Sequence, residues 1–459
     1  MRNVLIISQH FAPENHIASI RFTKMVKYLA RTGEYHFWVI CIGKKKDAIQ
    51  DKLLQRDLEE AAEHVTVFPI VMDKKLLKRL KKLFAVGRKK RISSGQKEDS
   101  GSKKDIYYTI RKKYVTCREK GIAGSIKRFV GRMLLAVNDV YDLIFEASFA
   151  RKGAALAKQI PMDRMDAMVT TYGHIGSFML GLKFKRMKKG LRWIVDYRDA
   201  VVPVSRIQKL YLDSIVLKAD AKADHITGAT DSCFGSGRYL DKFHVITNGF
   251  DREDIQGFQP GAGKSKLEIA YTGSLYGGKR DMGILFQIIA ELEAEGKVRS
   301  DKIAVLYAGA HFHILEDQAK IHGMTGILVN KGMLPREKAL ELQYQADILC
   351  VLSRSEEGYV NWLPGKTLEC FMMERPVFSI ITGTIAGSIV KRITEEAKLG
   401  YCYEEANAKR DYTEAKRWFL DRYMEFMQTG SVENHSEREI LEQYSSENMT
   451  RRFQRLIEN

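Results

Sequence analysis

A repeated alternation of short apolar runs with longer segments of helical periodicity is the feature that most constrains the fold of this 459-residue chain. The apolar run VLIIS (4–8) is followed by residues 20–32, in which Ile20, Met25 and Leu29 recur at helical spacing. A continuous apolar run is typical of a strand buried on both faces of a parallel sheet. Strands that alternate with helices predict an α/β fold with doubly wound parallel sheets, because crossover helices join parallel neighbours.

The same alternation runs through both halves of the chain. In the first half, further strands are expected at 36–43, 65–71, 166–171, 192–199 and 225–230, with helices at about 139–159 and 175–188. In the second half, strands are expected at the start of 267–281 and at 302–309, 326–334, 347–353 and 375–381, with helices at 282–295 and 335–346. The polar segment QPGAGKSK (259–266) predicts the linker between the halves.

The chain is therefore expected to form two Rossmann-like domains with a cleft between them, over residues 1–257 and 267–411. Residues 412–459 are expected to form C-terminal helices that can pack on either domain, including back on the N-terminal one. Ligands of open α/β sheets bind outside the carboxyl ends of the strands. The residues that follow the predicted strand ends are therefore the candidates for a site.

Cysteine usage and apolar content exclude several classes of protein. The six cysteines form no Cys-x-x-Cys pair and have no metal-ligand spacing, so no metal site is expected. Cys41, Cys350 and Cys370 lie in apolar runs, which predicts buried core thiols in a reducing cytoplasm. The start, MRNVLIISQHF, predicts a strand rather than a signal peptide, and no apolar run is long enough to span a membrane.

The stretch NWLPGKTLECF (361–371) carries the clearest local signal for a ligand. Lys366 falls in the first turn of a predicted helix, where a cation opposes the positive end of the helix dipole. The arrangement favours an anion such as a phosphate, shared between the lysine and the free N–H groups of the turn. Glu369 lies one turn further on the same face and can accept hydrogen bonds from a ribose diol. The alternative is a surface Lys–Glu ion pair.

Five segments, taken in order, resemble family 4 of the retaining glycosyltransferases (glycosyltransferase group 1), which have the GT-B fold of two Rossmann-like domains. The resemblance is closest to the branch that builds bacterial surface polysaccharides, and it covers nearly the whole chain except about 74–130. The segments are SQHFAPENHIASIRFTKMVKYL (8–29), DYRD (196–199), ITNGFD (246–251), YTGSLYGGKRD (271–281) and LPGKTLECFMMERPVF (363–378).

The resemblance implies an enzyme that moves a sugar, with retention and without a metal, from a UDP- or GDP-linked donor to a saccharide acceptor. The donor is a substrate, so no cofactor is implied, and the acceptor is expected to be lipid-linked. Glu369 matches the residue that holds the ribose. The other residues matched to the donor nucleotide are Gly273, Ser274, Lys279, Arg280, Leu363, Pro364, Gly365 and Lys366. For Lys279 and Arg280 the alternative is a solvated helix start.

The resemblance also implies residues near the reacting sugar. His174, in TTYGHIGSF, matches a histidine of the catalytic centre, although a histidine beside apolar residues is more often structural. Asp199 is the second catalytic candidate, with a role in orienting the acceptor; the alternative is that it caps the following segment. His16, Arg21 and Arg198 are assigned to the acceptor side, with Arg198 as the ion-pair partner of Asp199.

Two departures from the family pattern leave other functions open. His16-Ile17 stands where paired glycines are common, and Asn361, assigned to the donor sugar, stands where the family tends to have a glutamate. An asparagine can hydrogen-bond a sugar hydroxyl but supplies no charge. The alternatives are a non-catalytic binding or scaffold subunit and a sugar-nucleotide epimerase of the same fold.

A basic insertion at about 74–133 holds 21 Lys and Arg against 4 Asp and Glu, almost the whole excess of the +18 net charge. KKLLKRLKKLF (74–84) and IKRFVGRMLL (126–135) are basic and amphipathic, which predicts contact with an anionic membrane surface through 74–84 and 122–135. A cytoplasmic protein, peripheral on the inner face of the membrane, is expected. The alternative is that these apolar faces pack on the sheet. Few aromatics interleave the charges, so no nucleic-acid partner is expected.

Overall fold

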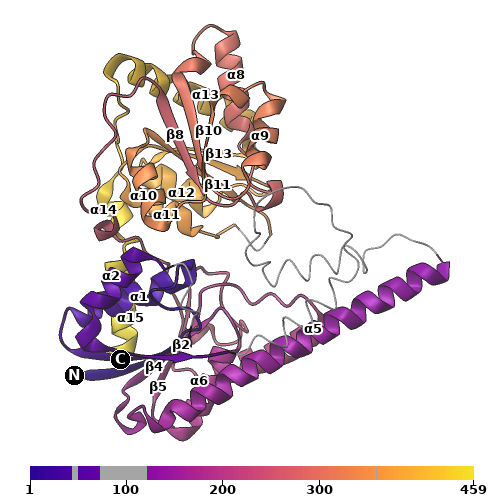
Figure 1. The fold of residues 1–459 in the computed structure, drawn as a ribbon, viewed down its shortest axis with the longest axis vertical. Helices are drawn as coiled ribbons and strands as arrows, with labels where there is room; N and C mark the ends of the chain where they lie inside the picture. The colour runs from indigo at the N-terminus through magenta and orange to yellow at the C-terminus, as the bar shows by residue number, and fades with distance from the viewer. Residues whose placement is uncertain (44–49, 73–120, 358–359) are drawn as a thin grey trace.

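The computed structural model describes residues 1–43, 50–72, 121–357 and 360–459, which contain two parallel sheets stacked along the long axis of the molecule (Figure 1). Every strand pair in both sheets is parallel. The expected architecture of two doubly wound, Rossmann-like sheets is therefore confirmed, and it is the GT-B fold.

The first sheet has seven strands in the order β3-β2-β1-β4-β5-β6-β7. The order reverses between β1 and β4, which is where a doubly wound sheet opens a crevice for a ligand. The strands are β1 (Arg2–Ile7), β2 (Tyr35–Ile42), β3 (Val65–Ile70), β4 (Ala167–Tyr172), β5 (Arg192–Tyr197), β6 (His225–Gly228) and β7 (Phe243–Val245). The α-helices described with them are α1 (Ile17–Ala30), α2 (Lys52–Glu60), α5 (Gly121–Ala155), α6 (Gly176–Met187) and α7 (Arg206–Lys222).

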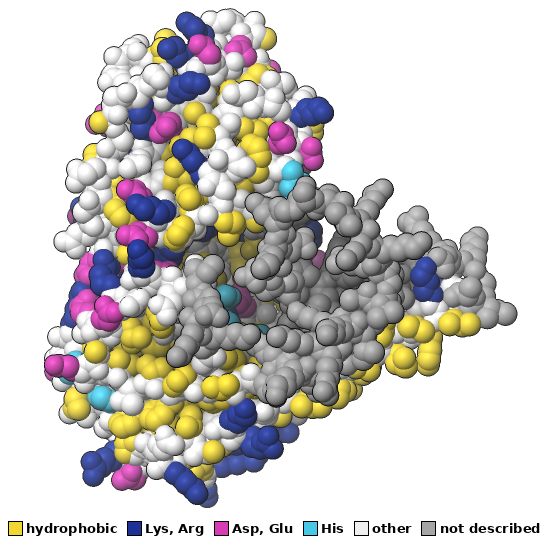
Figure 2. All heavy atoms as spheres, in the orientation of Figure 1, with side chains coloured by type: hydrophobic (Ala, Val, Ile, Leu, Met, Phe, Trp, Pro, Cys, Tyr) yellow, Lys and Arg dark blue, Asp and Glu magenta, His cyan; other side chains and the backbone are white. Residues whose placement is uncertain are grey.

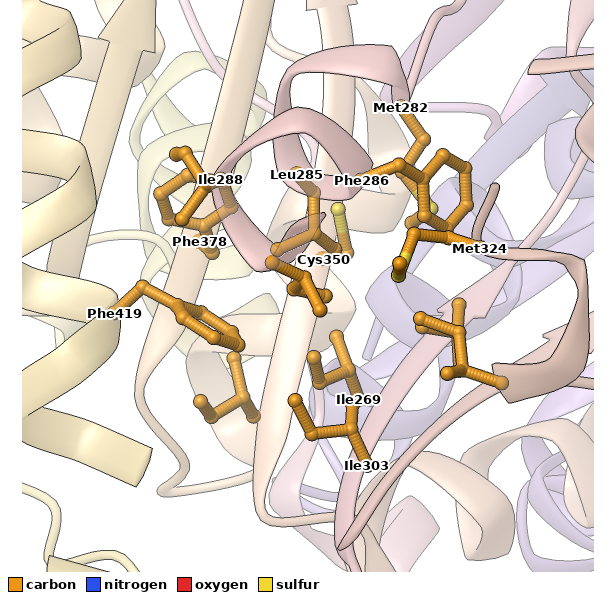
Figure 3. Packing of buried hydrophobic residues seen from close by; sticks show 14 of the residues in the cluster. Ile269, Met282, Leu285, Phe286, Ile288, Ile303, Met324, Cys350, Phe378 and Phe419 are labelled. Atoms are coloured by element: carbon orange, nitrogen blue, oxygen red, sulfur yellow. The ribbon is translucent and has the colours of Figure 1, made fainter. Parts of the chain in front are cut away.

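The second sheet has six strands in the order β10-β9-β8-β11-β12-β13, with its switch point between β8 and β11. Figure 3 shows how its core forms, with Phe286 of α8 and Phe419 of α13 packed around Ile269 and Phe378 of the sheet. The strands are β8 (Leu267–Thr272), β9 (Ile303–Ala308), β10 (Leu328–Gly332), β11 (Ile348–Arg354), β12 (Val377–Thr382) and β13 (Gly400–Glu404). The helices are α8 (Gly283–Ala294), α9 (Phe312–Ile321), α10 (Arg336–Gln345), α11 (Gly365–Met372), α12 (Ile389–Glu396) and α13 (Ala408–Thr429).

The C-terminal segment joins both halves. After α13, the short helix α14 (Arg438–Glu442) leads to α15 (Ser446–Glu458), which lies against the first sheet (Figure 1). Met449, Phe453 and Ile457 of α15 are buried in the same apolar cluster as Phe22 of α1. The chain therefore crosses between the two halves twice.

Helix α5 differs from the sequence prediction. The helix expected at 139–159 begins at Gly121 and takes in the amphipathic segment 126–135 as one continuous helix of 35 residues, which runs out from the sheet in Figure 1. Ile126, Phe129 and Met133 are 58%, 68% and 51% exposed. The alternative in which the apolar face of 126–135 packs on the sheet is therefore wrong for these residues. Segment 74–84 lies outside the described residues.

Two further expectations concern the cysteines and membrane-spanning helices. Cys41, Cys350 and Cys370 are buried free thiols, as predicted. Within the described residues, we find no helix with the length and apolar character needed to cross a bilayer.

Candidate active site

Lys366 and Glu369 lie at the start of α11, after the carboxyl end of β11. Pro364 has an extended conformation (φ −62°, ψ 140°) and ends the loop, so that Lys366 falls in the first helical turn. The Lys366 ammonium lies 2.7 Å from Oε2 of Glu369, and the glutamate side chain is only 9% exposed. Gln343 of α10 also approaches Oε2, at 3.4 Å. A carboxylate buried to this extent is not a plain surface ion pair.

The turn after β8 lies against Lys366. Gly273 has a φ of +141°, a conformation that L side chains rarely adopt, and a Cβ there would lie 3.9 Å from Cγ of Lys366. The Tyr307 hydroxyl donates to the Gly273 carbonyl at 3.1 Å, and the Tyr271 hydroxyl donates to the Ser274 carbonyl at 2.9 Å. The structure therefore brings the predicted turn 273–274 together with the predicted phosphate-binding lysine.

Lys279 and Arg280 precede α8 in a loop, because α8 begins only at Gly283. The Arg280 guanidinium lies 4.5 Å from the ring centre of Tyr276, with Nη1 3.4 Å from the Ser274 carbonyl. This contact places Arg280 on the same turn as Gly273. Lys279 is exposed, and its carbonyl accepts a hydrogen bond from the Thr382 hydroxyl at 3.4 Å.

The remaining predicted donor residues flank α11. The Asn361 amide donates to Oδ2 of Asp231 at 2.5 Å, and its carbonyl oxygen accepts from Arg392 at 2.8 Å. Its polar atoms therefore link the loop after β6 to α12. Leu363 is 8% exposed and belongs to the core beneath the loop.

On the first sheet, His174 follows the carboxyl end of β4. Its Nδ1 lies 3.3 Å from Oε1 of Glu146, a residue of α5 whose side chain is 4% exposed. The other oxygen of Glu146 accepts from Gln9 at 2.6 Å and from the Gly176 N–H at 3.0 Å. A single buried carboxylate thus orients His174 and ties α5 to the ends of β1 and β4.

His10 is a site residue that sequence reasoning did not support. Its ring stacks on His16 with 4.1 Å between centroids and lies 5.8 Å from the ring of His174. Its Nδ1 contacts Glu14 at 3.1 Å, and Nδ1 of His16 accepts the Ala18 N–H at the start of α1. The structure therefore gathers three imidazoles at one edge of the first sheet.

Arg198 and Asp199 follow β5 and lie beside this group. Nε of Arg198 lies 3.3 Å from Oδ2 of Asp199, so the expected ion pair is present. A Cβ on Gly173 would lie only 2.5 Å from Nη2 of Arg198. The guanidinium therefore lies over the backbone next to His174. Asp199 does not cap the next helix, because Ser205 caps α7.

The burial of Arg21 corrects the prediction that this residue lies on the acceptor side. The side chain of Arg21 is 1% exposed. Its guanidinium donates to Asp196 at 2.9 Å and to the carbonyls of Ile246 and Thr247 at 2.7 and 2.9 Å. Arg21 therefore ties α1 to β5 and to the segment that leaves the first sheet.

The two halves of the site face each other at the starts of α1 and α11. A Cβ on Gly365 would lie 2.6 Å from Cδ1 of Ile17, so the glycine admits this side chain. His16-Ile17, noted above as a departure from the family pattern, therefore lies at the first turn of α11. The start of α1, which carries His16, and the start of α11, which carries Lys366, are therefore in contact through Ile17.

Three carboxylates lie close enough to hold a metal ion in the part of the chain that the structure describes: Asp57, Asp251 and Asp254. The ammonium of Lys24 approaches all three, at 2.6, 2.7 and 2.5 Å. A lysine therefore occupies the position that a cation would take.

Comparison with known proteins gives the fold. No protein-family model and no curated protein matches the chain. Several solved structures match all of this chain and nearly all of their own, and three of them are as follows. A sucrose-phosphate synthase from Thermosynechococcus elongatus is 11% identical over 98% of its length, with a TM-score of 0.54. A trehalose-6-phosphate synthase is 12% identical over 99% of its length (TM-score 0.55), and the N-terminal domain of a Candida albicans trehalose-6-phosphate phosphatase is 12% identical over 96% (TM-score 0.56).

Proposed function

We propose that this protein is a glycosyltransferase that moves a sugar from a nucleotide-sugar donor to a saccharide acceptor, with retention and without a metal. The observation that carries the proposal is the Lys366–Glu369 pair at the start of α11, next to the Gly273 turn. A fixed cation beside backbone N–H groups suits a diphosphate, and a buried carboxylate suits a ribose diol. The synthases named above share the fold and add support.

The chemistry that these groups support is stabilisation of the leaving nucleoside diphosphate. Negative charge grows on the diphosphate as the glycosidic bond breaks, and fixed cations stabilise it in a site that needs no reorganisation. Lys366 and Arg280 would supply the cations, and Glu369 would hold the ribose. On the opposite side, Glu146 orients His174, and Arg198 lies beside it, which suits binding of the sugar and the acceptor hydroxyl.

A thermal-shift panel of UDP, GDP, ADP and CMP tests the donor site. We expect one diphosphate to stabilise the protein, since a ligand that binds only the folded state raises its stability by mass action. Glu369→Ala should abolish that shift, and addition of EDTA should leave it unchanged. Absence of a shift with every nucleotide would favour the scaffold alternative. Consumption of the matching sugar nucleotide without any acceptor, to give an isomeric donor, would favour the epimerase.

We also propose that α5 docks on an anionic membrane surface and that the acceptor is a lipid-linked saccharide of a bacterial surface polysaccharide. The apolar side chains on the free side of α5 are visible along its outer edge in Figure 2. They recur every three or four residues, as on one face of a helix. They are Ile126, Phe129, Met133, Val137, Val140 and Ile144, each at least 41% exposed.

Between Ile126 and Ile144, the exposed face of α5 is apolar, whereas a helix that packs on a core exposes a polar face. The acidic residues Asp139, Asp142 and Glu146 of α5 are all buried. Arg132 is exposed at the same end as Lys127 and Arg128. A second copy of α5 would bring like charges together, whereas each basic residue near an anionic bilayer contributes about 1 kcal/mol. We therefore propose that the protein is cytoplasmic and peripheral on the inner face of the membrane.

Sedimentation with vesicles tests the membrane surface. Vesicles of phosphatidylcholine with phosphatidylglycerol should bind the protein at low salt, and vesicles of phosphatidylcholine alone should bind it much less. Phe129→Glu should reduce binding by roughly tenfold or more, because a buried apolar side chain of this size contributes about 1.5–3 kcal/mol. Ile321→Glu is the matched control, since Ile321 is 79% exposed on the second domain. Equal loss in both variants would contradict the proposal.

A further inference from the structure

Arg336 is a buried arginine that connects the candidate ribose-binding glutamate to the first domain. It begins α10, and its side chain is 10% exposed. Nη2 lies 2.7 Å from Asp254, Nη1 lies 3.8 Å from Asp51, and Nε lies 3.9 Å from Oε1 of Glu369. Three carboxylates from three different elements therefore surround one guanidinium.

The anchor of Arg336 is itself fixed. Asp254 is fully buried and also accepts the Lys24 ammonium at 2.5 Å, while Asp51 caps α2 through the Leu53 and Leu54 N–H groups. Burial alone would raise the pKa of Asp254, but the charges of Arg336 and Lys24 outweigh it and hold that pKa below its ordinary value. Both carboxylates therefore have partners other than Arg336 that hold them in the first domain.

The contact of Arg336 with Glu369 is electrostatic and involves no hydrogen bond. Within the described residues, the hydrogen bonds to Glu369 come from Lys366 and Gln343 and both reach Oε2. Oε1 faces Arg336 at 3.9 Å without a hydrogen bond, and Nε and Nη1 of Arg336 are buried without a hydrogen-bond partner. The guanidinium thus attracts Glu369 electrostatically and leaves the lone pairs of Oε1 for another donor.

We propose that Arg336 is a positioning residue for the nucleotide, which holds Oε1 of Glu369 toward the ribose diol from an anchor on Asp254. This inference rests on the proposed function. If it is right, the affinity for a ribonucleotide depends on the contact between Arg336 and Asp254. That contact joins the two domains, and the nucleotide does not touch it. The dependence is specific to the sugar hydroxyls, because Arg336 acts only through Glu369.

Binding of ribonucleotides and their 2′,3′-dideoxy analogues to the full chain, by calorimetry, tests the proposal. UDP and GDP are the probes, each with its dideoxy counterpart. Wild type should prefer the ribonucleotide, and Arg336→Gln and Glu369→Gln should each reduce that preference at least fivefold. In the Glu369→Gln background, adding Arg336→Gln should not reduce the preference for the ribonucleotide further. Arg252→Gln is the matched control, since Arg252 also bridges the halves, through Glu374 and Glu442, without touching Glu369.

Removal of Arg336 alone leaves Asp254 short of a partner, so the single variant risks unfolding. Arg336→Gln combined with Asp254→Asn removes both charges and should show the same loss of preference. Retention of the wild-type preference in a folded variant would overturn the proposal. If wild type binds neither ribonucleotide, the proposed function fails and this inference with it, and that outcome is distinct from the first.

Discussion

Gly173 shows how one missing side chain shapes the part of the candidate site around His174. A Cβ at this position would lie 2.5 Å from Nη2 of Arg198, a separation that real Cβ atoms essentially never show. Gly173→Ala should therefore displace the guanidinium from beside His174 and lower kcat/KM, with the donor found by thermal shift, by about tenfold or more. Gly190→Ala is the control, because nothing lies within 4 Å of a Cβ there. Equal activity of the two variants would mean that Arg198 has no role in turnover.

The site residues that were predictable are those whose partners are close in sequence. Lys366 and Glu369 are three residues apart, so helix geometry alone places them together. Glu146 carries no local signal, since its partners Gln9 and His174 meet it only through the sheet. His10 could have been found from strand order, because β1 and β4 are neighbours and both histidines follow strand ends.

Arg21 was misassigned for a related reason. It was assigned to the acceptor side, while its acceptors lie 175 and 225 residues further along the chain. Burial of a charge requires partners, and distant partners do not appear in a local pattern. The same holds for Lys24, whose carboxylates come from α2 and from residues 251–254.

At the scale of elements, the end of α13 offers a test of backbone strain alone. Gly430 follows the helix with a φ of +76° and donates its N–H to the Phe426 carbonyl. Nothing lies within 4 Å of a Cβ at this position. Gly430→Ala should therefore lower the free energy of unfolding by about 1 kcal/mol, and Gly430→Asn by less, because asparagine tolerates this conformation better. Urea denaturation measures both, and equal stabilities would contradict the assignment of the helix end.

Apolar periodicity predicted the alternation of strands and helices and most of the strands, but not α2, α7, α9, α12 or β13. Helix α5 shows another place where that signal fails. Periodicity rests on the rule that the apolar face of a helix points to the core. In α5 the exposed face of the outer part is apolar, and Asp139, Asp142 and Glu146 are buried beside Tyr141 and Phe149. The pattern therefore suggested two helices where the structure has one. The rule holds for α8 and α13, whose apolar faces do pack on the second sheet.

At the scale of the whole molecule, α15 makes the first domain depend on the far end of the chain. Phe453 is fully buried, packs 5.7 Å from the ring of Phe22 and lies beneath the Arg21 guanidinium. Phe453→Ala should cost about 3–5 kcal/mol through lost burial and a cavity. Hydrogen exchange should then rise in β1 and α1 before it rises in the second sheet. A uniform rise in both sheets would show that the two halves unfold as one unit.

The charge cluster of Lys24, Lys27, Asp251 and Glu253 should make stability depend on acidic pH. Burial would raise the pKa of Asp251, but Lys24 and Lys27 outweigh it and lower that pKa, and the hydrogen bond from Arg31 lowers the pKa of Glu253 to about 2. Carboxylates with lowered pKa values stabilise the fold above their unfolded values of about 4, and this stability is lost as the pH falls toward 2. The urea midpoint should therefore fall as the pH is lowered from about 4 to about 2, and fall less steeply in Asp251→Asn.

The return of α15 to the first sheet also has a consequence for synthesis on the ribosome. The strands of that sheet are complete at Val245, yet Met449, Phe453 and Ile457 complete its core. At the usual rates of translation, the missing helix emerges roughly 10–40 s after the last strand. During that interval the nascent first domain exposes the groove that α15 will fill, so this is the stage at which a chaperone would bind and at which a stalled chain would aggregate.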